Sequence, residues 1–317
     1  MNALRLFACS VAFASIGCGS SGSDATAPAD ASSNDGAGPA DAGSSITDAE
    51  SSEAAAIVAA RPYTLHVPTG YDATKPTPLV VMFHGYSASG ALEELYMNIT
   101  PTSDSAGFLY AYGDGTIDDA GNRFWNATDG CCNFDGSKVD DVAYFNAIVD
   151  DVSAKYNVDP KRVFVLGHSN GGFMAHRLAC DMAPRVASIV SLAGVVWEDP
   201  TKCSPANPVA VLDIHGNADQ TIGYDGGVAS GVYPSESATM TTWSQKNGCT
   251  GQLAATGQTL DVDTQLPGSE TVVATVGGCP TGVDVQLWTI QGGSHIPSLT
   301  PTWGSMVWGF FNTHPKP

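Results

Sequence analysis

The feature that most constrains the fold is a Gly-x-Ser-x-Gly pentapeptide at residues 167–171, with Ser169 at its centre. An apolar, β-branched run precedes it, and a helix-compatible segment follows from Phe173 to Cys180. This order is typical of a nucleophile elbow, a tight strand-to-helix turn that lifts a serine hydroxyl out of a sheet. The pentapeptide alone is a weak motif, and a solvated serine in a glycine-rich turn is the alternative. The rest of the chain therefore has to supply a base, an acid and oxyanion donors.

Apolar runs and helix-like stripes alternate along the chain. Buried or alternating runs predict strands at 61–68, 79–83, 107–112, 162–166, 186–192, 209–214 and 283–290. Stripes with helical spacing predict helices at 139–156, 173–180, 238–247 and 303–311. Strands that alternate with helices imply a mostly parallel sheet with helices on both faces. We therefore expect an α/β fold.

An acidic residue follows the predicted strand at 209–214. The strand leads into His215-Gly216-Asn217-Ala218-Asp219, and a loop after a late strand is where the acid of a Ser, Asp, His order belongs. We assign Asp219 to this role. Asp213 lies within the strand and Asp225 lies further along the loop, so both are weaker candidates.

The candidate base follows the last predicted strand. His295 lies in the glycine-rich segment 291–297, from which a histidine can reach the serine with little steric hindrance. Three other histidines have less suitable positions. His215 precedes the acid, His176 lies on the helix after the serine, and His314 lies near the C-terminus.

The strand at 79–83 ends in His84-Gly85. A His-Gly pair after a buried strand, upstream of an elbow, is where hydrolases of this architecture place part of the oxyanion hole. We expect the backbone N–H groups of Tyr86 and Asn170 to be the two donors. We interpret His84 itself as a structural histidine bonded to the backbone, in preference to an acid–base role.

A long segment at 113–140 is rich in Gly, Asp and Asn and contains several aromatic residues. Loops of this length in compact domains are usually functional or disordered. We expect a substrate-facing surface here, with Trp125 as its candidate residue. The spacing of the aspartates does not fit an EF-hand, so we interpret them as turn residues and expect no metal site.

The N-terminus resembles a bacterial export signal. Arg5 precedes an apolar run that is too short to span a membrane, and Ser15-Ile16-Gly17-Cys18 resembles a lipobox. We expect a lipoprotein-type signal at 1–18, with Cys18 lipidated and anchoring an exported protein to a membrane. An ordinary secretory signal with an incidental cysteine is the alternative. Residues 19–55 are rich in Ser, Ala, Gly and Asp, which indicates a disordered linker before one domain at 56–317.

Charge and cysteine content add two expectations. The net charge of −19 argues against a nucleic-acid partner, whose phosphates would be repelled. Six cysteines follow Cys18, and an even number in an exported chain suggests disulfides. Six cysteines allow 15 pairings. We favour Cys180–Cys203 and Cys249–Cys279, with the adjacent Cys131 and Cys132 paired to each other.

Taken together, these motifs resemble a family of exported esterases that groups polyhydroxybutyrate depolymerases with feruloyl and acetylxylan esterases. The resemblance covers about residues 61–313. It rests on Val81-Met82-Phe83-His84-Gly85, Phe124-Trp125-Asn126-Ala127, Val139-Asp140-Asp141-Val142, Gly167 to Cys180, His215-Gly216-Asn217-Ala218-Asp219, Trp243 with Asn247-Gly248-Cys249, and Gly292-Gly293-Ser294-His295.

The resemblance implies an α/β-hydrolase fold in which Ser169, Asp219 and His295 match the triad of the family. It implies a serine esterase that acts on a polymer or plant cell-wall ester, works without a cofactor, and is a monomer. The family often has Gly-Gly-Gly-His followed by Trp-Pro, whereas this chain has Ser294 and Ile296. This difference concerns the leaving-group pocket. An acetylxylan or other polysaccharide-ester deacetylase, and a non-catalytic polysaccharide-binding lipoprotein of the same fold, are the competing interpretations.

Overall fold

The structure is a computed structural model that describes residues 44–316 of the chain. The predicted signal segment, Cys18 and most of the predicted linker lie outside the described residues. Within residues 44–316, no helix combines the length and the apolar character needed to cross a bilayer.

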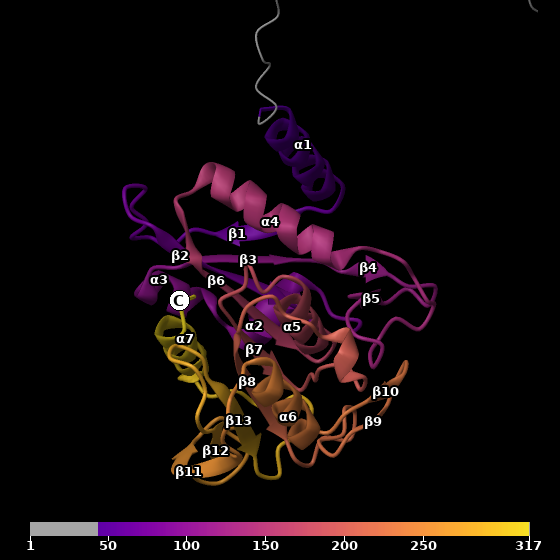
Figure 1. The fold of residues 1–317 in the computed structure, drawn as a ribbon, viewed down its shortest axis with the longest axis vertical. Helices are drawn as coiled ribbons and strands as arrows, with labels where there is room; N and C mark the ends of the chain where they lie inside the picture. Colours follow the sequence, from indigo (N-terminus) through magenta and orange to yellow (C-terminus); the bar gives the residue numbers. More distant parts are fainter. Residues whose placement is uncertain (1–43, 317) are drawn as a thin grey trace, which may run out of the picture. The chain divides into compact units, whose positions relative to one another are not determined.

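A nine-stranded sheet forms the centre of the described part (Figure 1). The strand order is β1-β3-β2-β6-β7-β8-β13-β12-β11. The six strands from β3 to β13 in this order run parallel, whereas β1, β12 and β11 are antiparallel to their neighbours. The strands are β1 (Tyr63–His66), β2 (Thr77–Phe83), β3 (Leu109–Gly113), β6 (Val158–His168), β7 (Ser188–Leu192), β8 (Ala210–Gly216), β11 (Leu253–Leu260), β12 (Thr271–Val276) and β13 (Val285–Ile290).

Helices cover both faces of this sheet. The helices are α1 (Ser44–Ala60), α2 (Gly90–Met97), α3 (Thr100–Ala106), α4 (Asp141–Lys155), α5 (Asn170–Asp181), α6 (Glu236–Lys246) and α7 (Trp303–Thr313). One core cluster joins the sheet to α4, α5 and α6, and a second joins its other face to α7. The predicted α/β class, with a mostly parallel sheet and helices on both faces, is confirmed.

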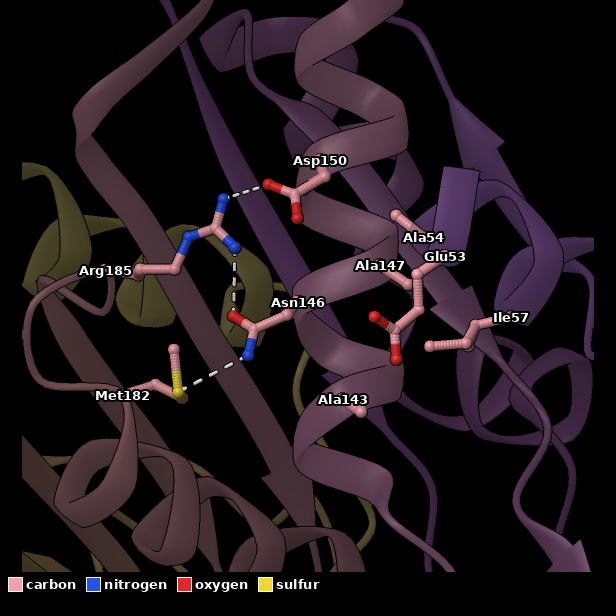
Figure 2. A pocket seen from close by; sticks show the side chains of 9 residues that line it. All are labelled: Glu53, Ala54, Ile57, Ala143, Asn146, Ala147, Asp150, Met182 and Arg185. Carbon is pink, nitrogen blue, oxygen red and sulfur yellow. Dashed lines mark hydrogen bonds and ion pairs between the residues drawn. The ribbon is translucent and has the colours of Figure 1, made fainter. Parts of the chain in front are cut away.

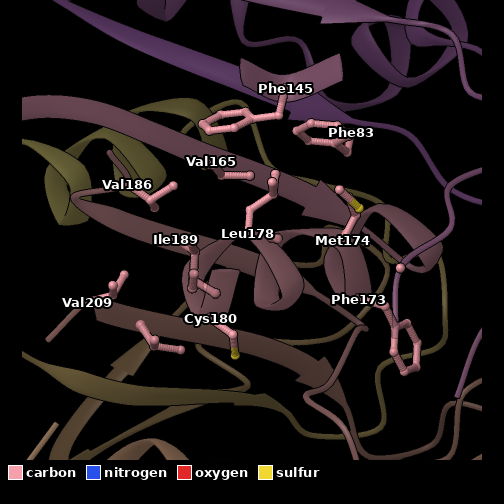
Figure 3. Packing of buried hydrophobic residues seen from close by; sticks show 14 of the residues in the cluster. Phe83, Phe145, Val165, Phe173, Met174, Leu178, Cys180, Val186, Ile189 and Val209 are labelled. Atoms are coloured by element: carbon pink, nitrogen blue, oxygen red, sulfur yellow. The ribbon is translucent and has the colours of Figure 1, made fainter. Parts of the chain in front are cut away.

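The two clusters are separated by the alternation of side chains along each strand. In β2, Leu79, Val81 and Phe83 belong to the first cluster, whereas Val80 and Met82 belong to the second. Successive side chains of a strand point to opposite faces, so a continuous apolar run is stable only where both faces are covered. Figure 3 shows the first cluster, in which side chains of α5 pack against the sheet and against Phe145 of α4.

Helix α1 crosses the boundary predicted between linker and domain. Residues 44–55, which the sequence assigns to the linker, form the first part of α1. In its second half, Ala54 is buried and Ile57 packs against the first core cluster. The composition of residues 44–55 is polar, but alanine favours a helix, and the packing of Ala54 and Ile57 stabilises α1.

Two further regions differ from expectation. The segment 113–140 is not one open loop, because it contains a small hairpin of β4 (Thr116–Ile117) and β5 (Arg123–Phe124). A second hairpin, β9 (Gly227–Val228) with β10 (Val232–Tyr233), follows β8. Strands β11 and β12 extend the sheet through a stretch for which no structure was predicted.

The three predicted disulfides are present. Cys180 pairs with Cys203, Cys249 with Cys279, and Cys131 with Cys132. The first ties the end of α5 to the segment after β7, and the second ties the loop after α6 to the loop after β12. The Cys131–Cys132 pair belongs to the segment 113–140, and both of its cysteines are buried.

Candidate active site

Ser169 lies at the turn between β6 and α5. Its backbone has φ 54° and ψ −123°, a conformation that side chains rarely adopt. An added Cβ at Gly167 would lie 2.0 Å from the carbonyl oxygen of Gly171, and one at Gly171 would lie 1.9 Å from that of Phe83. No side chain fits at those distances, so both glycines of the pentapeptide are required by the close packing of strand and helix. The predicted elbow geometry is confirmed.

The structure brings Ser169, His295 and Asp219 together from three separate loops. Nε2 of His295 lies 2.9 Å from Oγ of Ser169, and Nδ1 of His295 lies 2.7 Å from Oδ2 of Asp219. A carboxylate only accepts hydrogen bonds, so Nδ1 carries the proton and donates it. Nε2 of a neutral His295 is then free to accept the hydroxyl proton of Ser169.

The surroundings favour a neutral His295 beside an ionised Asp219. Burial lowers the pKa of His295, and this effect outweighs the opposing hydrogen bond to Asp219. Burial raises the pKa of Asp219, but hydrogen bonds from His215 and His295 outweigh it and hold this pKa below its usual range. The backbone N–H groups of Thr221 and Ile222 also donate to Oδ1 of Asp219, at 2.7 and 3.0 Å.

The other candidate acids and bases are occupied elsewhere. Asp213 is buried and pairs with His176, whose Nε2 lies 3.1 Å from its Oδ1. Asp225 is exposed on the loop before β9. His314 ends α7 and bonds to Asp284, at the opposite end of β13 from the loop that carries His295. None of these four bonds to Ser169.

The expected oxyanion donors lie next to Ser169 in the fold. Asn170 is the first residue of α5, where a backbone N–H has no partner within the helix. The backbone N–H of Tyr86 has no acceptor among the described residues, and Tyr86 shares a pocket with Ser169. His84 is the structural histidine predicted for this loop. It is buried, its Nδ1 bonds to the carbonyl of Gly85, and its Nε2 accepts from the N–H of Gly115.

The prediction that Trp125 faces the substrate is wrong. Trp125 is fully buried, with its ring edge-on to Phe83 and stacked on Tyr144. Its indole N–H donates to the carbonyl of His84 at 2.9 Å, so the polar end of the ring is satisfied inside the core. Its backbone N–H donates to Oδ1 of Asn170 at 2.6 Å. Trp125 therefore stabilises the elbow through the hydrogen bond from its backbone N–H to Asn170.

A pocket of about 460 Å³ opens beside Ser169. Its lining is mostly apolar, and three exposed side chains stand at its mouth. Leu92 and Leu95 of α2 are 56% and 78% exposed, and Ile296 is 60% exposed. The full lining consists of Gly85, Tyr86, Ser87, Ala88, Leu92, Glu93, Leu95, Tyr96, His168, Ser169, His295 and Ile296. An apolar group attached to a carbonyl at Ser169 would fit this surface.

A second pocket, of about 450 Å³, lies where α1 and α4 meet the loop after α5 (Figure 2). Arg185 reaches across it to Asp150 and to Asn146, and Asn146 donates to the sulfur of Met182. Its described lining has no serine, histidine or cysteine, so it offers no serine or cysteine nucleophile with a histidine base.

The sequence did not point to Glu236, His168 or Glu93, and it offered His215 only as an alternative base. His215 lies between two carboxylates, with Nε2 3.0 Å from Oδ2 of Asp219 and Nδ1 2.5 Å from Oε1 of Glu236. Burial lowers the pKa of His215, but these two carboxylates outweigh burial and raise it to about 10. On the other side of Ser169, the imidazole of His168 pairs with the carboxylate of Glu93. No pattern in the sequence relates these partners.

Among the described residues, no group of three or more His, Cys, Asp or Glu side chains could hold a metal ion.

The comparison with protein families agrees with this geometry. The profile of the family described as esterase PHB depolymerase matches residues 61–250, which is more than half of the chain. The chain belongs to this esterase family. The matched range contains Ser169 and Asp219 but ends before His295, so the position of His295 rests on the structure.

Curated relatives carry esterase names. The chain is 28% identical over 252 residues to feruloyl esterase B of Piromyces equi, covering 77% of this chain and 43% of that protein. It is 27% identical over 245 residues to feruloyl esterase D of Neurospora crassa, covering 75% of this chain and 74% of that protein. The chain thus spans less than half the length of the Piromyces relative.

Solved structures of esterases share the fold. The acetyl xylan esterase from Aspergillus awamori superimposes with a TM-score of 0.55 at 16% identity, covering 79% of this chain and 93% of that one. Esterase PE8 superimposes with a TM-score of 0.51 at 14% identity, covering 80% of this chain and 98% of that one. At this identity the likeness concerns the fold, and the expected α/β-hydrolase architecture is confirmed.

Proposed function

We propose that this protein is an exported serine esterase that hydrolyses carboxylic esters through a triad of Ser169, His295 and Asp219. The observation that carries the proposal is the continuous chain of hydrogen bonds from Asp219 through His295 to Ser169, ending at a pocket. A serine with a histidine base oriented by a carboxylate is the arrangement needed for acyl transfer.

In the proposed mechanism, Ser169 attacks the ester carbonyl while Nε2 of His295 takes its proton. Asp219 keeps the proton of His295 on Nδ1 and stabilises the imidazolium that forms. The backbone N–H groups of Tyr86 and Asn170 hold the negative oxygen of the tetrahedral intermediate. His295 then gives its proton to the departing alcohol, and water releases the acid from the acyl-enzyme. Every acid, base, nucleophile and oxyanion donor in this mechanism belongs to the chain.

The proposed substrate is a polymer or plant cell-wall ester of the hydroxyalkanoate or feruloyl kind. The family match and the feruloyl esterase names of two relatives support this class. So does the apolar mouth of the pocket formed by Leu92, Leu95 and Ile296. An acetyl group would leave most of this surface unused, which makes a deacetylase the alternative.

We also propose that the protein is exported and held at a membrane through Cys18. The support is the apolar run that ends in a lipobox-like sequence, together with three disulfides in the described residues, which are typical of exported proteins. Cys18→Ser should move the protein from the membrane fraction to the soluble fraction. Soluble wild-type protein that begins at another cleavage site would contradict the anchor.

The test of the enzymatic proposal is a substrate panel with a covalent label. Purified protein is assayed on p-nitrophenyl butyrate, methyl ferulate, acetylated xylan and polyhydroxybutyrate granules, and a fluorophosphonate probe is mapped by mass spectrometry. We expect hydrolysis and a label on Ser169. Folded protein that hydrolyses no ester and takes no label would instead support a non-catalytic binding protein.

A further inference from the structure

Glu93 lies in the first turn of α2 and is buried beside the candidate site, with 3% of its surface exposed. Its two oxygens have different partners. Oε2 accepts the backbone N–H of Gly85 at 2.9 Å, and Oε1 lies 3.1 Å from Nδ1 of His168. One carboxylate therefore joins the loop before Tyr86 to the residue before Ser169.

The imidazole of His168 continues this connection to a third loop. Its Nε2 lies 3.0 Å from the backbone carbonyl oxygen of His295. Glu93 and His168 thus link the loop of the proposed oxyanion donor, the elbow and the loop of the proposed base. These three loops are far apart in the chain. Glu93 bonds to the first loop, and His168 belongs to the second and bonds to the third.

A second contact from α2 reaches the same loop. The hydroxyl of Tyr96 donates to the carbonyl of Pro297 at 2.9 Å, and the rings of Tyr96 and His168 lie 5.4 Å apart. The loop of His295 is therefore held on both sides of Ile296, by His168 of β6 at His295 and by Tyr96 of α2 at Pro297. Two fixed points restrict how far the imidazole of His295 can move from Ser169.

The hydrogen bonds also define the charge of His168. Both of its ring nitrogens face acceptors, a carboxylate oxygen and a carbonyl oxygen. Only the imidazolium form donates from both nitrogens. His295 differs, since one of its nitrogens faces the hydroxyl of Ser169, which can donate.

We propose that Glu93 and His168 are positioning residues, a buried carboxylate–imidazolium pair that holds His295 in reach of Ser169 and fixes the loop at Gly85. This role rests on the proposed serine esterase function. Neither side chain takes part in the proposed bond changes. They act on the reaction through His295 and through the backbone of the Gly85–Tyr86 segment.

The charges around both histidines give the pair a second effect. His168 faces Glu93 from α2, with His295 and Asp219 on its other side. His295 faces Asp219, His168 and His215. The imidazolium of His168 lies closer to His295 than the carboxylate of Glu93 does, because Glu93 bonds to the nitrogen on the far side of the ring. The pair as a whole therefore disfavours a proton on His295.

The kinetic test compares two changes at Glu93. Glu93→Gln retains the shape and every hydrogen bond, with its amide donating to a neutral His168, whereas Glu93→Ala removes them. We expect Glu93→Ala to lower kcat on the order of 10²-fold with KM changed less than about threefold, because a misplaced base loses reactive geometry. Glu93→Gln should stay within about tenfold of wild type. Its acid limb of kcat/KM should move upward by about half a pH unit, since the cation beside His295 is gone.

The matched control is Asp284→Asn. His314 also lies between a carboxylate and a carbonyl, those of Asp284 and Phe310, but at the other end of β13. This variant makes the same chemical change away from Ser169, so kcat and the pH profile should match wild type. A folded Glu93→Ala with wild-type kinetics, or two Glu93 variants with equal losses, would overturn the positioning role. If Glu93→Ala does not fold, an unmoved acid limb in Glu93→Gln overturns it.

A measurement without turnover separates this inference from the proposed function. In Ser169→Ala, ¹⁵N chemical shifts should show a His168 that stays protonated at both nitrogens through pH 8, while His295 titrates at lower pH. A neutral His168 at pH 7 would overturn the imidazolium even in an active enzyme. Conversely, a protonated His168 in a protein without esterase activity would leave the pair standing and remove the proposed function.

Discussion

Two histidine–carboxylate pairs use carboxylates from one short stretch of the chain, and only one of the pairs reaches a pocket. Asp213, within β8, pairs with His176 of α5, and Asp219, six residues further on, pairs with His295. His176 is fully buried, and its second nitrogen accepts the indole N–H of Trp243 at 2.9 Å. The second nitrogen of His295 faces Ser169 at a pocket. A histidine–carboxylate pair is therefore no active site by itself, because reactivity needs an accessible hydroxyl.

The two carboxylates also differ electrostatically. Burial raises the pKa of Asp213 to about 7, because its main compensation is the single pairing with His176. The pKa of Asp219 is held low despite burial, since two histidines and two backbone N–H groups donate to it. The number of donors around each carboxylate decides which of the two stays ionised.

Replacing the hydroxyl that distinguishes the two pairs should have the largest effect. Ser169→Ala removes the proposed nucleophile, so kcat for p-nitrophenyl butyrate should fall on the order of 10⁶-fold with unchanged folding. Ser191→Ala is the control, because it removes a buried serine hydroxyl that donates to the carbonyl of Gly194. It should leave kcat/KM within about threefold, at a stability cost of about 1 kcal/mol. Near-native turnover by folded Ser169→Ala would remove the distinction between the pairs.

The next largest effect is expected at Asp219, the acid of the pair that reaches the pocket. Asp219→Asn should lower kcat roughly 10⁴-fold with little change in KM, because an amide no longer holds the proton of His295 on Nδ1. The residual activity should rise at high pH, where hydroxide can replace the base. Steady-state kinetics from pH 6 to pH 10 test this, and a mild loss would require a different acid.

The pocket beside Ser169 and His295 should determine which acyl groups of an ester substrate are accepted. The double change Leu92→Ser and Leu95→Ser removes the apolar mouth, and we expect kcat/KM for p-nitrophenyl octanoate to fall about tenfold. The acetate ester should be nearly unaffected, because its acyl group does not reach the two side chains. Equal losses on both esters would contradict the assignment of this surface to the acyl chain.

His295 and His176 should differ in the pH at which they take up a proton. The pKa of His295 is lowered by burial, whereas that of His176 is raised, because its interaction with Asp213 outweighs burial. A base must be neutral to act, so activity is lost as pH falls through the pKa of His295. The acid limb of kcat/KM should therefore lie below pH ~6.5, the ordinary histidine value. An acid limb above pH 7 would point to a different histidine as the base.

The parts of the site that follow a strand could be predicted, and the parts that depend on tertiary contacts could not. Ser169, Asp219 and His295 each come within a few residues after an apolar run, and parallel strands bring their carboxyl ends to one edge. Glu93 and His168 are 75 residues apart, and neither position has a local signal. Trp125 was misplaced because an aromatic residue in a polar segment can be either exposed or buried. Strand β11 was missed because most of it is exposed and its apolar residues do not alternate.

The smallest effect on activity is expected at the enclosed pair, Asp213 and His176. Asp213→Asn should leave kcat/KM within about tenfold of wild type, because neither Asp213 nor His176 bonds to Ser169, His295 or Asp219. The effect of Asp213→Asn should appear in stability.

The pKa of Asp213 is raised from 3.8 to about 7 in the folded protein, so the folded state retains a proton that the unfolded state has released. The wild type should then lose stability relative to the variant as pH rises from about 4 through about 7, and melting temperatures at pH 5 and pH 8 measure this. If the melting temperatures of the two proteins change equally between pH 5 and pH 8, the buried, protonated Asp213 is contradicted. A loss of kcat as large as that of Asp219→Asn, in a folded protein, would instead transfer the acid to the enclosed pair and reverse the comparison.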